Sequence, residues 1–383
     1  MIAVIADDLT GAAELAGIGL NYGLTVEIAM TVDPASTADL LVISTDARSV
    51  SESEAVQEMV TVSRALLPMK PQLIYKKVDS VLRGHVMAEA LAQLAPLGLT
   101  KALIVSANPA LGRTIVNGQY YVRGELIHQT HFSEDPEFPV TESDVYERFT
   151  SKVDRLIVQP HYGSLSDAEI IIGEVNDEAD LHAWVGRIDE QTLPCGGAGF
   201  FAALLAALTG LKLEKPAPVS LGDRRLYICG SAFGASVDLV RRAAMTGTRV
   251  CYMPGELTCS GTLPGDRRAS WAGELVQQMQ LHNQVIVAID PSTVERGSGL
   301  AVHLRTTMAT AVKLALAQMS IDELMIEGGS TASAVLREIG VMRLAPTNEL
   351  APGVVRSKAF GNENVHITVK PGSYPWPPDL WPF

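Results

Sequence analysis

Residues 1–14, MIAVIADDLTGAAE, decide the fold class of this chain. Ile2–Ala6 is an unbroken apolar run of strand length, and two carboxylates, Asp7 and Asp8, follow it directly. From Ala12 to Tyr22 the apolar residues recur at spacings of three and four, which predicts a helix. A continuously apolar strand that leads through a polar turn into a helix is typical of a parallel sheet covered by helices on both faces.

The same pattern extends outward from this stretch. Further strands are expected at Val26–Met30, Leu40–Ser44, Leu73–Lys76, Ala102–Val105, Leu156–Val158 and Glu169–Ile172, and helices at Ser53–Leu67 and Met87–Leu94. Residues 111–145 have no sustained period and predict an irregular insertion with hairpin character. After a Pro- and Lys-rich linker, strands are expected at Leu226–Cys229, Val285–Ile289 and Leu324–Ile326, and the last thirty residues are rich in glycine and proline. The chain therefore predicts an α/β protein of two domains, 1–220 and 221–383, each built on a largely parallel sheet flanked by helices.

Composition excludes several classes of protein. The chain has 383 residues, 47% of them hydrophobic, so it has enough apolar material for packed cores. Its formal net charge of −13 argues against binding to nucleic acid or to an anionic membrane surface. Its longest apolar run, residues 200–208, is too short to span a bilayer, and the start lacks a signal-peptide pattern. The four cysteines form no C-x-x-C pair, which indicates free thiols in a cytoplasmic protein.

Polar residues end several of the expected strands in the N-terminal half. Asp7 and Asp8 follow the first strand, and Asp79 and Ser80 follow a later one. In open α/β sheets ligands bind outside the carboxyl ends of the strands, so these residues predict a polar site at one sheet edge. The alternative is that each cluster only caps the following helix. Successive residues point apart, so we expect one of the two N-terminal carboxylates to cap a helix and the other to act as a base on a substrate hydroxyl.

Basic residues gather near the same predicted edge. The segment from Lys76 to His85 carries two lysines and Arg83, Arg48 follows the neighbouring strand, and Arg113 lies in the insertion. A guanidinium group matches a carboxylate in a planar, bidentate manner, which favours a small organic acid as ligand. The alternative is an ordinary cluster of surface ion pairs.

Glycine turns follow strands of the C-terminal half. Gly328-Gly329-Ser330-Thr331 leads onto an expected helix, Gly230-Ser231 repeats the pattern, and Lys370-Pro371-Gly372-Ser373 lies near the end. Such turns let backbone N–H groups approach an anion at a helix start, although they also occur simply as connections. No G-x-x-x-x-G-K-[ST] or G-x-G-x-x-G motif is present, which argues against a P-loop and a dinucleotide site.

The segments IADDLTGAAE (5–14), KKVDSVLRGH (76–85) and NPALGRTIVNGQYYV (108–122) resemble the four-carbon acid sugar kinase family, which includes D-threonate, D-erythronate and 3-oxo-tetronate kinases. GSAFGAS (230–236), GGSTASAVL (328–336) and the late GVVR and VKPGS segments resemble its nucleotide-binding half. The resemblance implies an N-terminal sugar-acid-binding domain, a C-terminal ATP-binding domain and an active site in the cleft between them.

The resemblance also implies roles for individual residues. Asp8, or its neighbour Asp7, matches a substrate-binding aspartate, Arg48 a substrate-binding arginine, and Lys77, Val78, Asp79 and Ser80 a substrate-binding segment; Ser231, Gly328, Gly329, Ser330, Thr331 and Gly372 match nucleotide-binding positions. Two departures fall on the nucleotide side. Ser330 stands where the family usually has a carboxylate, and Pro371 alters the family's late Lys-Ser-Gly motif.

The resulting hypothesis is a kinase that uses ATP and Mg²⁺ to phosphorylate a hydroxyl of a four-carbon sugar acid. Asp8 is the predicted catalytic residue, and Arg83 and Arg113 join the predicted substrate-binding residues. The Mg²⁺ ligands are not identified, although Asp290 and Glu327 end strands on the nucleotide side. Two alternatives stay open: a sugar-acid-binding protein without ATP chemistry, and a nucleotide-independent lyase or isomerase that uses Lys77. The apolar tail, residues 376–383, is expected to dock on its own domain or on a second subunit of a homo-oligomer.

Overall fold

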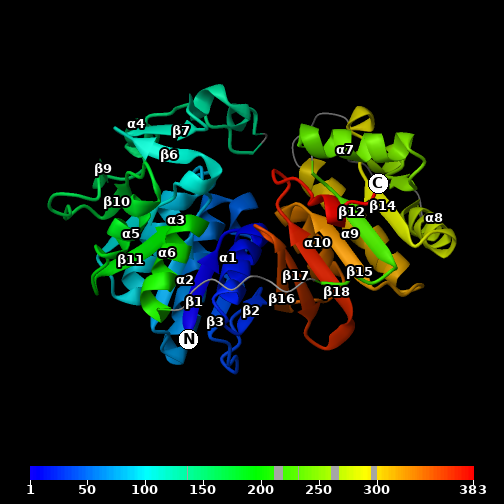
Figure 1. Ribbon diagram of the computed structural model, residues 1–383, viewed down its shortest axis with the longest axis horizontal. Helices are drawn as coiled ribbons and strands as arrows, with labels where there is room; N and C mark the ends of the chain where they lie inside the picture. The colour runs from blue at the N-terminus through cyan, green and yellow to red at the C-terminus, as the bar shows by residue number, and fades with distance from the viewer. Residues whose placement is uncertain (136, 211–218, 232, 260–266, 295–299) are drawn as a thin grey trace. The chain divides into compact units, whose positions relative to one another are not determined.

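The computed structural model describes the chain except for residues 136, 211–218, 232, 260–266 and 295–299. The chain divides into two compact units, Met1–Glu214 and Lys215–Phe383 (Figure 1). Each unit contains its own set of strands and its own helices.

The first unit is built on a sheet in which every strand pair is parallel. Its strands are, in spatial order, β2 (Val26–Ala29), β3 (Leu40–Ser44), β1 (Ile2–Ala6), β4 (Leu73–Lys77), β11 (Thr192–Gly196), β5 (Lys101–Val105), β10 (Ile170–Gly173) and β9 (Leu156–Gln159). The predicted strands are confirmed to within a residue or two at their ends. Their side chains are almost continuously buried, as expected for a sheet that is covered on both faces.

Helices cover both faces of this sheet. They are α1 (Leu9–Asn21), α2 (Glu52–Leu66), α3 (Val86–Leu97), α4 (Val145–Phe149), α5 (Glu178–Val185) and α6 (Ala198–Thr209), with short 3₁₀ turns η1 (Ala47–Ser49), η2 (Leu67–Met69), η3 (Pro109–Leu111), η4 (Ile127–Gln129) and η5 (His131–Glu134). Helix α2 packs through Met59 and Leu66 on Ala3 and Ile5 of β1 and contacts α3. Helix α1 contacts α6, which contacts α5, and these helices form a second layer (Figure 1).

The segment predicted as an irregular insertion forms a small antiparallel sheet of β6 (Arg113–Val116), β7 (Gln119–Val122) and β8 (Glu125–Leu126). Its two hairpin turns are Asn117-Gly118 and Arg123-Gly124, and all four residues have positive φ. That conformation is the one required by two-residue type I′ turns, whose twist matches that of the strands. The hairpin character expected from the sequence is therefore confirmed, and the segment is more regular than its composition predicts.

The second unit contains a mixed sheet. In spatial order its strands are β13 (Val250–Tyr252), β14 (Gln284–Ala288), β12 (Arg225–Cys229), β15 (Glu323–Glu327), β18 (Asn362–Lys370), β17 (Val354–Ala359) and β16 (Arg343–Ala351). The pairs from β13 to β18 are parallel, whereas β18 pairs with β17, and β17 with β16, in antiparallel fashion. The predicted α/β class with largely parallel sheets is confirmed. The antiparallel strands after residue 342 were missed, because glycine and proline punctuate this part of the sequence.

Helices and the tail cover the second sheet. The helices are α7 (Gly234–Met245), α8 (Arg267–Leu281), α9 (Leu300–Leu316) and α10 (Gly329–Glu338), with short turns η6 (Gly255–Leu257), η7 (Pro291–Thr293) and η8 (Pro378–Leu380). Helices α8, α9 and α10 contact one another in series. Trp376 and Trp381 of the tail are buried together with Val240 of α7 against Tyr227 of β12. The tail thus packs on its own unit, which is one of the two alternatives for its docking.

The described residues also bear on two expectations from the sequence, one about a membrane span and one about the cysteines. None of its described helices combines the length and apolar character that a bilayer span requires. The four cysteines are unpaired, and Cys195, Cys229 and Cys251 are buried. Burial raises the pKa of each of these three thiols.

Candidate active site

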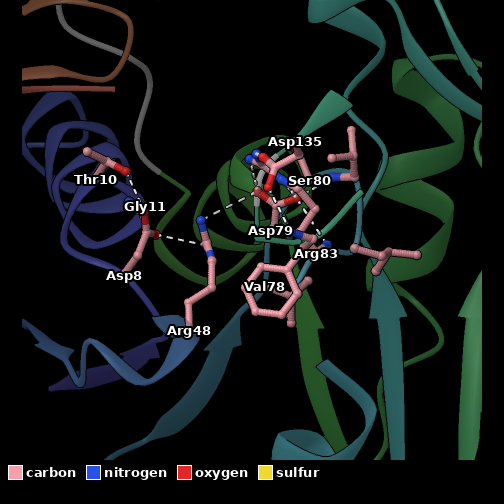
Figure 2. Close-up of polar contacts among 12 residues, drawn as sticks. Asp8, Thr10, Gly11, Arg48, Val78, Asp79, Ser80, Arg83 and Asp135 are labelled. Carbon is pink, nitrogen blue, oxygen red and sulfur yellow. Dashed lines mark hydrogen bonds and ion pairs between the residues drawn. The ribbon is translucent and has the colours of Figure 1, made fainter. Parts of the chain in front are cut away.

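The carboxyl ends of β3, β1 and β4 lie side by side in the first unit. The register places Ser44, Ala6 and Lys77 next to one another, so the residues that follow these strands emerge at the same edge. Asp7 and Asp8 follow β1, Arg48 lies in η1 after β3, and Asp79 follows β4. Figure 2 shows the Arg48 guanidinium between Asp8 and Asp79. Strand order therefore brings together charged residues that are far apart in the sequence.

Arg48 is the centre of this cluster. Its Nε and Nη2 donate to both carboxylate oxygens of Asp7 at 2.7 and 2.9 Å. Nη2 also donates to Asp8 Oδ1 at 3.1 Å, and Nη1 lies 3.7 Å from Asp79 Oδ1. Burial lowers the pKa of Arg48, but these three carboxylates outweigh it and the pKa lies well above its ordinary value. The guanidinium is thus permanently charged and holds three carboxylates in a fixed arrangement.

Asp7 and Asp8 differ in exposure. The Asp7 side chain is 3% exposed and that of Asp8 is 15% exposed. Asp8 is the N-cap of α1: its Oδ1 accepts from Gly11 N at 2.9 Å, and its Oδ2 accepts from Thr10 Oγ1 at 2.5 Å. The helix begins at Leu9, before the expected Ala12, and Asp8 both caps it and binds Arg48. The expected cap is therefore Asp8, and the cap position still lets this carboxylate reach the Arg48 guanidinium.

Asp79 anchors the turn after β4. Its two oxygens accept from Arg83 Nε at 3.0 Å and Nη2 at 2.8 Å, and Oδ2 also accepts the backbone N–H groups of Val81 and Arg83. Burial raises the pKa of Asp79, but Arg83 and Arg48 outweigh it and hold the pKa well below its ordinary value. Arg83 Nη1 also donates to Asp135 Oδ2 at 2.7 Å (Figure 2). The Asp79 carboxylate is consequently ionised at any physiological pH.

Arg113 reaches the same place from the small antiparallel sheet. Its Nη1 donates to Ser80 Oγ, and its guanidinium lies 5.6 Å from the centre of the Phe132 ring. In the described part of the chain, no Asp or Glu side chain forms an ion pair with Arg113. This arginine therefore differs from Arg48 and Arg83, which are each paired with aspartates.

Lys77 and Val78 lie beside the cluster. Lys77 Nζ donates to the carbonyl of Val78 at 3.0 Å and lies 3.7 Å from Glu14 Oε2, and only 3% of the residue is exposed. Gly11 lets this side chain approach, because a Cβ there would lie 3.1 Å from Lys77 Nζ and 2.6 Å from Asp8 Oδ1. Lys77, which the alternative lyase or isomerase would use, thus already contacts backbone and carboxylate oxygens.

Sequence reasoning missed several residues of this site. The Tyr120 hydroxyl donates to the Ser80 carbonyl, and Arg148 donates to the carbonyls of Val81 and Leu82 at 2.9 and 2.8 Å. Burial lowers the pKa of Arg148 to about 10. Both residues come from segments that follow the insertion's first strand, and their spacing from Asp79 carries no recognisable signal.

The predicted nucleotide residues gather at the carboxyl ends of β12, β15 and β18, which are neighbours in the second sheet. Gly328, with φ of 94°, precedes α10, whose first turn contains Gly329, Ser330 and Thr331. A Cβ on Gly230 would lie 2.2 Å from Thr331 Oγ1, and one on Gly372 would lie 2.7 Å from Ser231 Oγ. These contacts show that the three glycine turns are packed against one another. Together they present a helix N-terminus at one sheet edge.

A hollow adjoins these turns. It is lined by residues that include Ser231, Ser236, Arg241, Tyr252 and Asp290. Asp290 accepts from Ser292 N at 3.0 Å and caps η7. Within the described residues, no three His, Cys, Asp or Glu side chains come together as a metal site would require. The hollow therefore contains one carboxylate and several polar groups beside the glycine turns.

The fold and these two clusters define a protein with an acid-and-arginine site on one α/β unit and a glycine-turn site on the other. A family described as "Sugar-binding N-terminal domain" matches residues 2–204, and one described as "Nucleotide-binding C-terminal domain" matches residues 256–374. The chain therefore belongs to the four-carbon acid sugar kinase family, as its N-terminal motifs indicated.

Curated relatives extend over most of the chain. A D-threonate kinase of Salmonella typhimurium is 25% identical and covers 91% of this chain and 89% of its own length. A 3-oxo-tetronate kinase of Pseudomonas fluorescens is 23% identical and covers 98% of this chain and 94% of its own. A D-erythronate kinase of Heliobacterium modesticaldum is 36% identical, over 36% of this chain and 33% of its own.

Two crystal structures share the fold. One, of a Salmonella typhimurium protein, superimposes with a TM-score of 0.79 at 20% identity and covers 98% of this chain and 96% of its own. The other, of a Haemophilus influenzae protein, has a TM-score of 0.71 at 20% identity, with 97% of each chain covered. These similarities establish the architecture of the chain.

Proposed function

We propose that this protein is an ATP-dependent kinase that phosphorylates a hydroxyl group of a four-carbon sugar acid of the threonate or erythronate type. The observation that carries the proposal is the cluster of Asp8, Arg48 and Asp79 at the edge of the first sheet, in a chain whose second unit gathers three glycine turns at the edge of its own sheet. Phosphoryl transfer leaves little covalent work to the protein, so catalysis rests on positioning and charge.

On the acceptor side, Asp8 is the proposed catalytic residue. It is the more exposed of the two N-terminal aspartates, and three donors fix its orientation. A carboxylate held in this way can take the proton of the attacking hydroxyl. The surrounding residues proposed to bind the substrate are Asp7, Arg48, Lys77, Val78, Asp79, Ser80 and Arg83. Arg113 has no carboxylate partner in the described chain, and we assign to it the carboxylate of the sugar acid.

On the nucleotide side, Ser231, Gly328, Gly329, Ser330, Thr331 and Gly372 are proposed to bind ATP. The N–H groups of the first turn of α10 have no intrahelical partners, and the helix dipole favours a phosphate there. Mg²⁺ usually keeps several waters and binds through phosphates and one or two carboxylates. Asp290 in the adjoining hollow fits that need, whereas Glu327 is buried and bound to Lys370 and Trp376. Bound Mg²⁺ would neutralise phosphate charge.

The test is to measure ADP release with D-threonate, D-erythronate and 3-oxo-tetronate, with and without Mg²⁺. We expect turnover with at least one acid, dependent on both ATP and Mg²⁺. A folded sample that binds a sugar acid in calorimetry but gives no heat with ATP and Mg²⁺ would instead support the binding protein. Consumption of a sugar acid without nucleotide would support the lyase or isomerase.

Changing Arg113 to methionine should raise the KM for the sugar acid by about 10- to 100-fold, because a hydrogen bond to a charged group contributes roughly 1.5–3 kcal/mol. The KM for ATP should stay unchanged, since Arg113 lies in the first unit. Arg123→Met in the neighbouring turn, where the side chain is exposed, is the matched control. Equal KM values for the acid in the Arg113 variant and the wild type would remove Arg113 from the site.

A further inference from the structure

A buried ion pair lies directly behind the glycine turns of the second unit. Glu327 is the last residue of β15 and is 1% exposed, and Lys370 is the last residue of β18 and is 0% exposed. The two residues are paired in the sheet register, and Lys370 Nζ lies 3.4 Å from Glu327 Oε2. The glycine turns begin with the next residues, Gly328 and Pro371. The pair is therefore placed to influence both turns, although neither side chain is open to solvent.

Lys370 bonds to both of these turns. Its ammonium donates to the carbonyls of Pro371 at 2.8 Å and Tyr374 at 2.5 Å, which enclose the turn that contains Gly372. Its own carbonyl accepts from Gly328 N at 2.9 Å. Burial lowers the pKa of Lys370 despite the neighbouring Glu327. With its donors directed to these oxygens, Lys370 is not presented as a ligand for a phosphate.

The C-terminal tail joins the same network. Trp376 Nε1 donates to Glu327 Oε2 at 2.7 Å, and the Trp376 ring lies 5.3 Å from Lys370 Nζ. The ring of Trp376 also stacks on that of Trp381, with the two ring centres 5.8 Å apart, and both rings belong to the core that contains Tyr227. The tail is thereby connected through Glu327 and Lys370 to the two glycine turns.

We propose that Lys370 and Glu327 are positioning residues that hold the Pro371–Tyr374 turn and the Gly328 turn in the arrangement that binds the nucleotide phosphates, with Trp376 of the tail as their third member. This inference rests on the proposed function, because it assumes that these turns bind a nucleotide. An ammonium group inside the protein requires partners, and here two of them are carbonyls of the turn itself. Loss of the ammonium would release the turn that carries Gly372.

The test separates positioning from a purely structural role by removing both charges. Lys370→Met alone leaves Glu327 buried without its cation and should destabilise the protein. In the double variant Lys370→Met/Glu327→Gln no unpaired charge remains, and glutamine can still accept from Trp376, so the urea midpoint should return close to that of the wild type. The double variant should nevertheless bind ATP with Mg²⁺ at least tenfold more weakly in calorimetry, with unchanged affinity for the sugar acid. Wild-type ATP affinity in the double variant would overturn the proposal.

The matched control is Lys313→Met/Glu338→Gln, which removes an ion pair on α9 and α10 whose side chains are 53% and 33% exposed. Neither stability nor ATP affinity should change. If the wild type gave no heat with ATP in calorimetry, the proposed function would fail. Hydrogen exchange would then test, independently of nucleotide binding, whether the ion pair holds the turn in place. The backbone amides of Gly372, Ser373 and Tyr374 should exchange at least tenfold faster in the double variant, and equal exchange would contradict the inference.

Trp376→Phe provides a second variant should the double variant fail to fold. It keeps an aromatic ring in the core but removes the hydrogen bond to Glu327. We expect the Kd for ATP to rise severalfold while the sugar-acid affinity stays constant. An unchanged Kd for ATP would exclude the tail from the positioning network.

Discussion

Replacing Asp8 by asparagine is expected to lower kcat for phosphoryl transfer by about 10²- to 10⁴-fold, the usual contribution of a general base. Asparagine has the same shape and is an equally good N-cap, so α1 should persist. What the variant loses is the negative charge that accepts a proton and that faces Arg48 at 3.1 Å. Steady-state kinetics at saturating sugar acid and ATP would measure the loss, and circular dichroism would verify the fold.

Asp177→Asn is the matched control for this experiment. Asp177 is the N-cap of α5 in the same unit, where it accepts from the backbone N–H groups of Ala179 and Asp180, and it takes no part in the charged cluster. Its kcat should equal that of the wild type. A wild-type kcat for Asp8→Asn would mean that Asp8 serves the fold as a helix cap and does not serve the chemistry.

Asp79→Asn should lower the free energy of unfolding by roughly 3 kcal/mol, because it removes the buried carboxylate that accepts from Arg83 and leaves that arginine with Asp135 as its carboxylate partner. Asp79 accepts two hydrogen bonds from the Arg83 side chain, and its Oδ1 lies 3.7 Å from Arg48 Nη1. The side chains of Asp79 and Arg83 are 7% and 23% exposed, so water screens this pair only in part. Urea denaturation followed by circular dichroism would measure the change. Asp154→Asn, at an exposed position, should change stability by less than about 0.5 kcal/mol.

The same variant predicts a pH dependence. The pKa of Asp79 lies well below 3.8 in the folded protein, whereas the unfolded chain takes up a proton near that value. Stability from this carboxylate is thus fully present above pH 3.8 and is lost as the pH falls from there toward the folded pKa. The wild type should lose stability more steeply than Asp79→Asn below pH 3.8. Parallel profiles for the two proteins would show that Asp79 is not the source of acid sensitivity.

Much of the fold could be predicted from local pattern. Continuous apolar runs such as Ile2–Ala6 and Leu40–Ser44 match the observed strands, because a strand buried on both faces can carry few polar residues. The strands β17 and β18 could not be predicted in this way. They lie between the glycine turn at Gly353 and the proline-rich tail, and Val354–Ala359, with the sequence VVRSKA, is neither a continuous apolar run nor an alternation of apolar and polar residues.

The residues of the candidate site could be predicted from the sequence, but the hydrogen bonds and ion pairs among them could not. Strand-end position and family motifs pointed to Asp8, Arg48, Asp79 and Arg113. They did not reveal that Arg48 is held by three aspartates or that Arg113 has no carboxylate partner in the described chain. These differences change the roles proposed for the two arginines. They depend on which side chains meet in space, and residue type alone does not carry that information.

By itself the sequence determined the α/β class, the polar strand ends and the glycine turns, because apolar period and turn chemistry act over a few neighbouring residues. Only the tertiary structure decided which charges neutralise one another: β1, β3 and β4 become neighbours through long-range pairing, and Lys370 meets Glu327 because β18 pairs with β15. Electrostatic partners are chosen by distances of a few ångströms, and such distances between remote segments exist only once the sheet has formed.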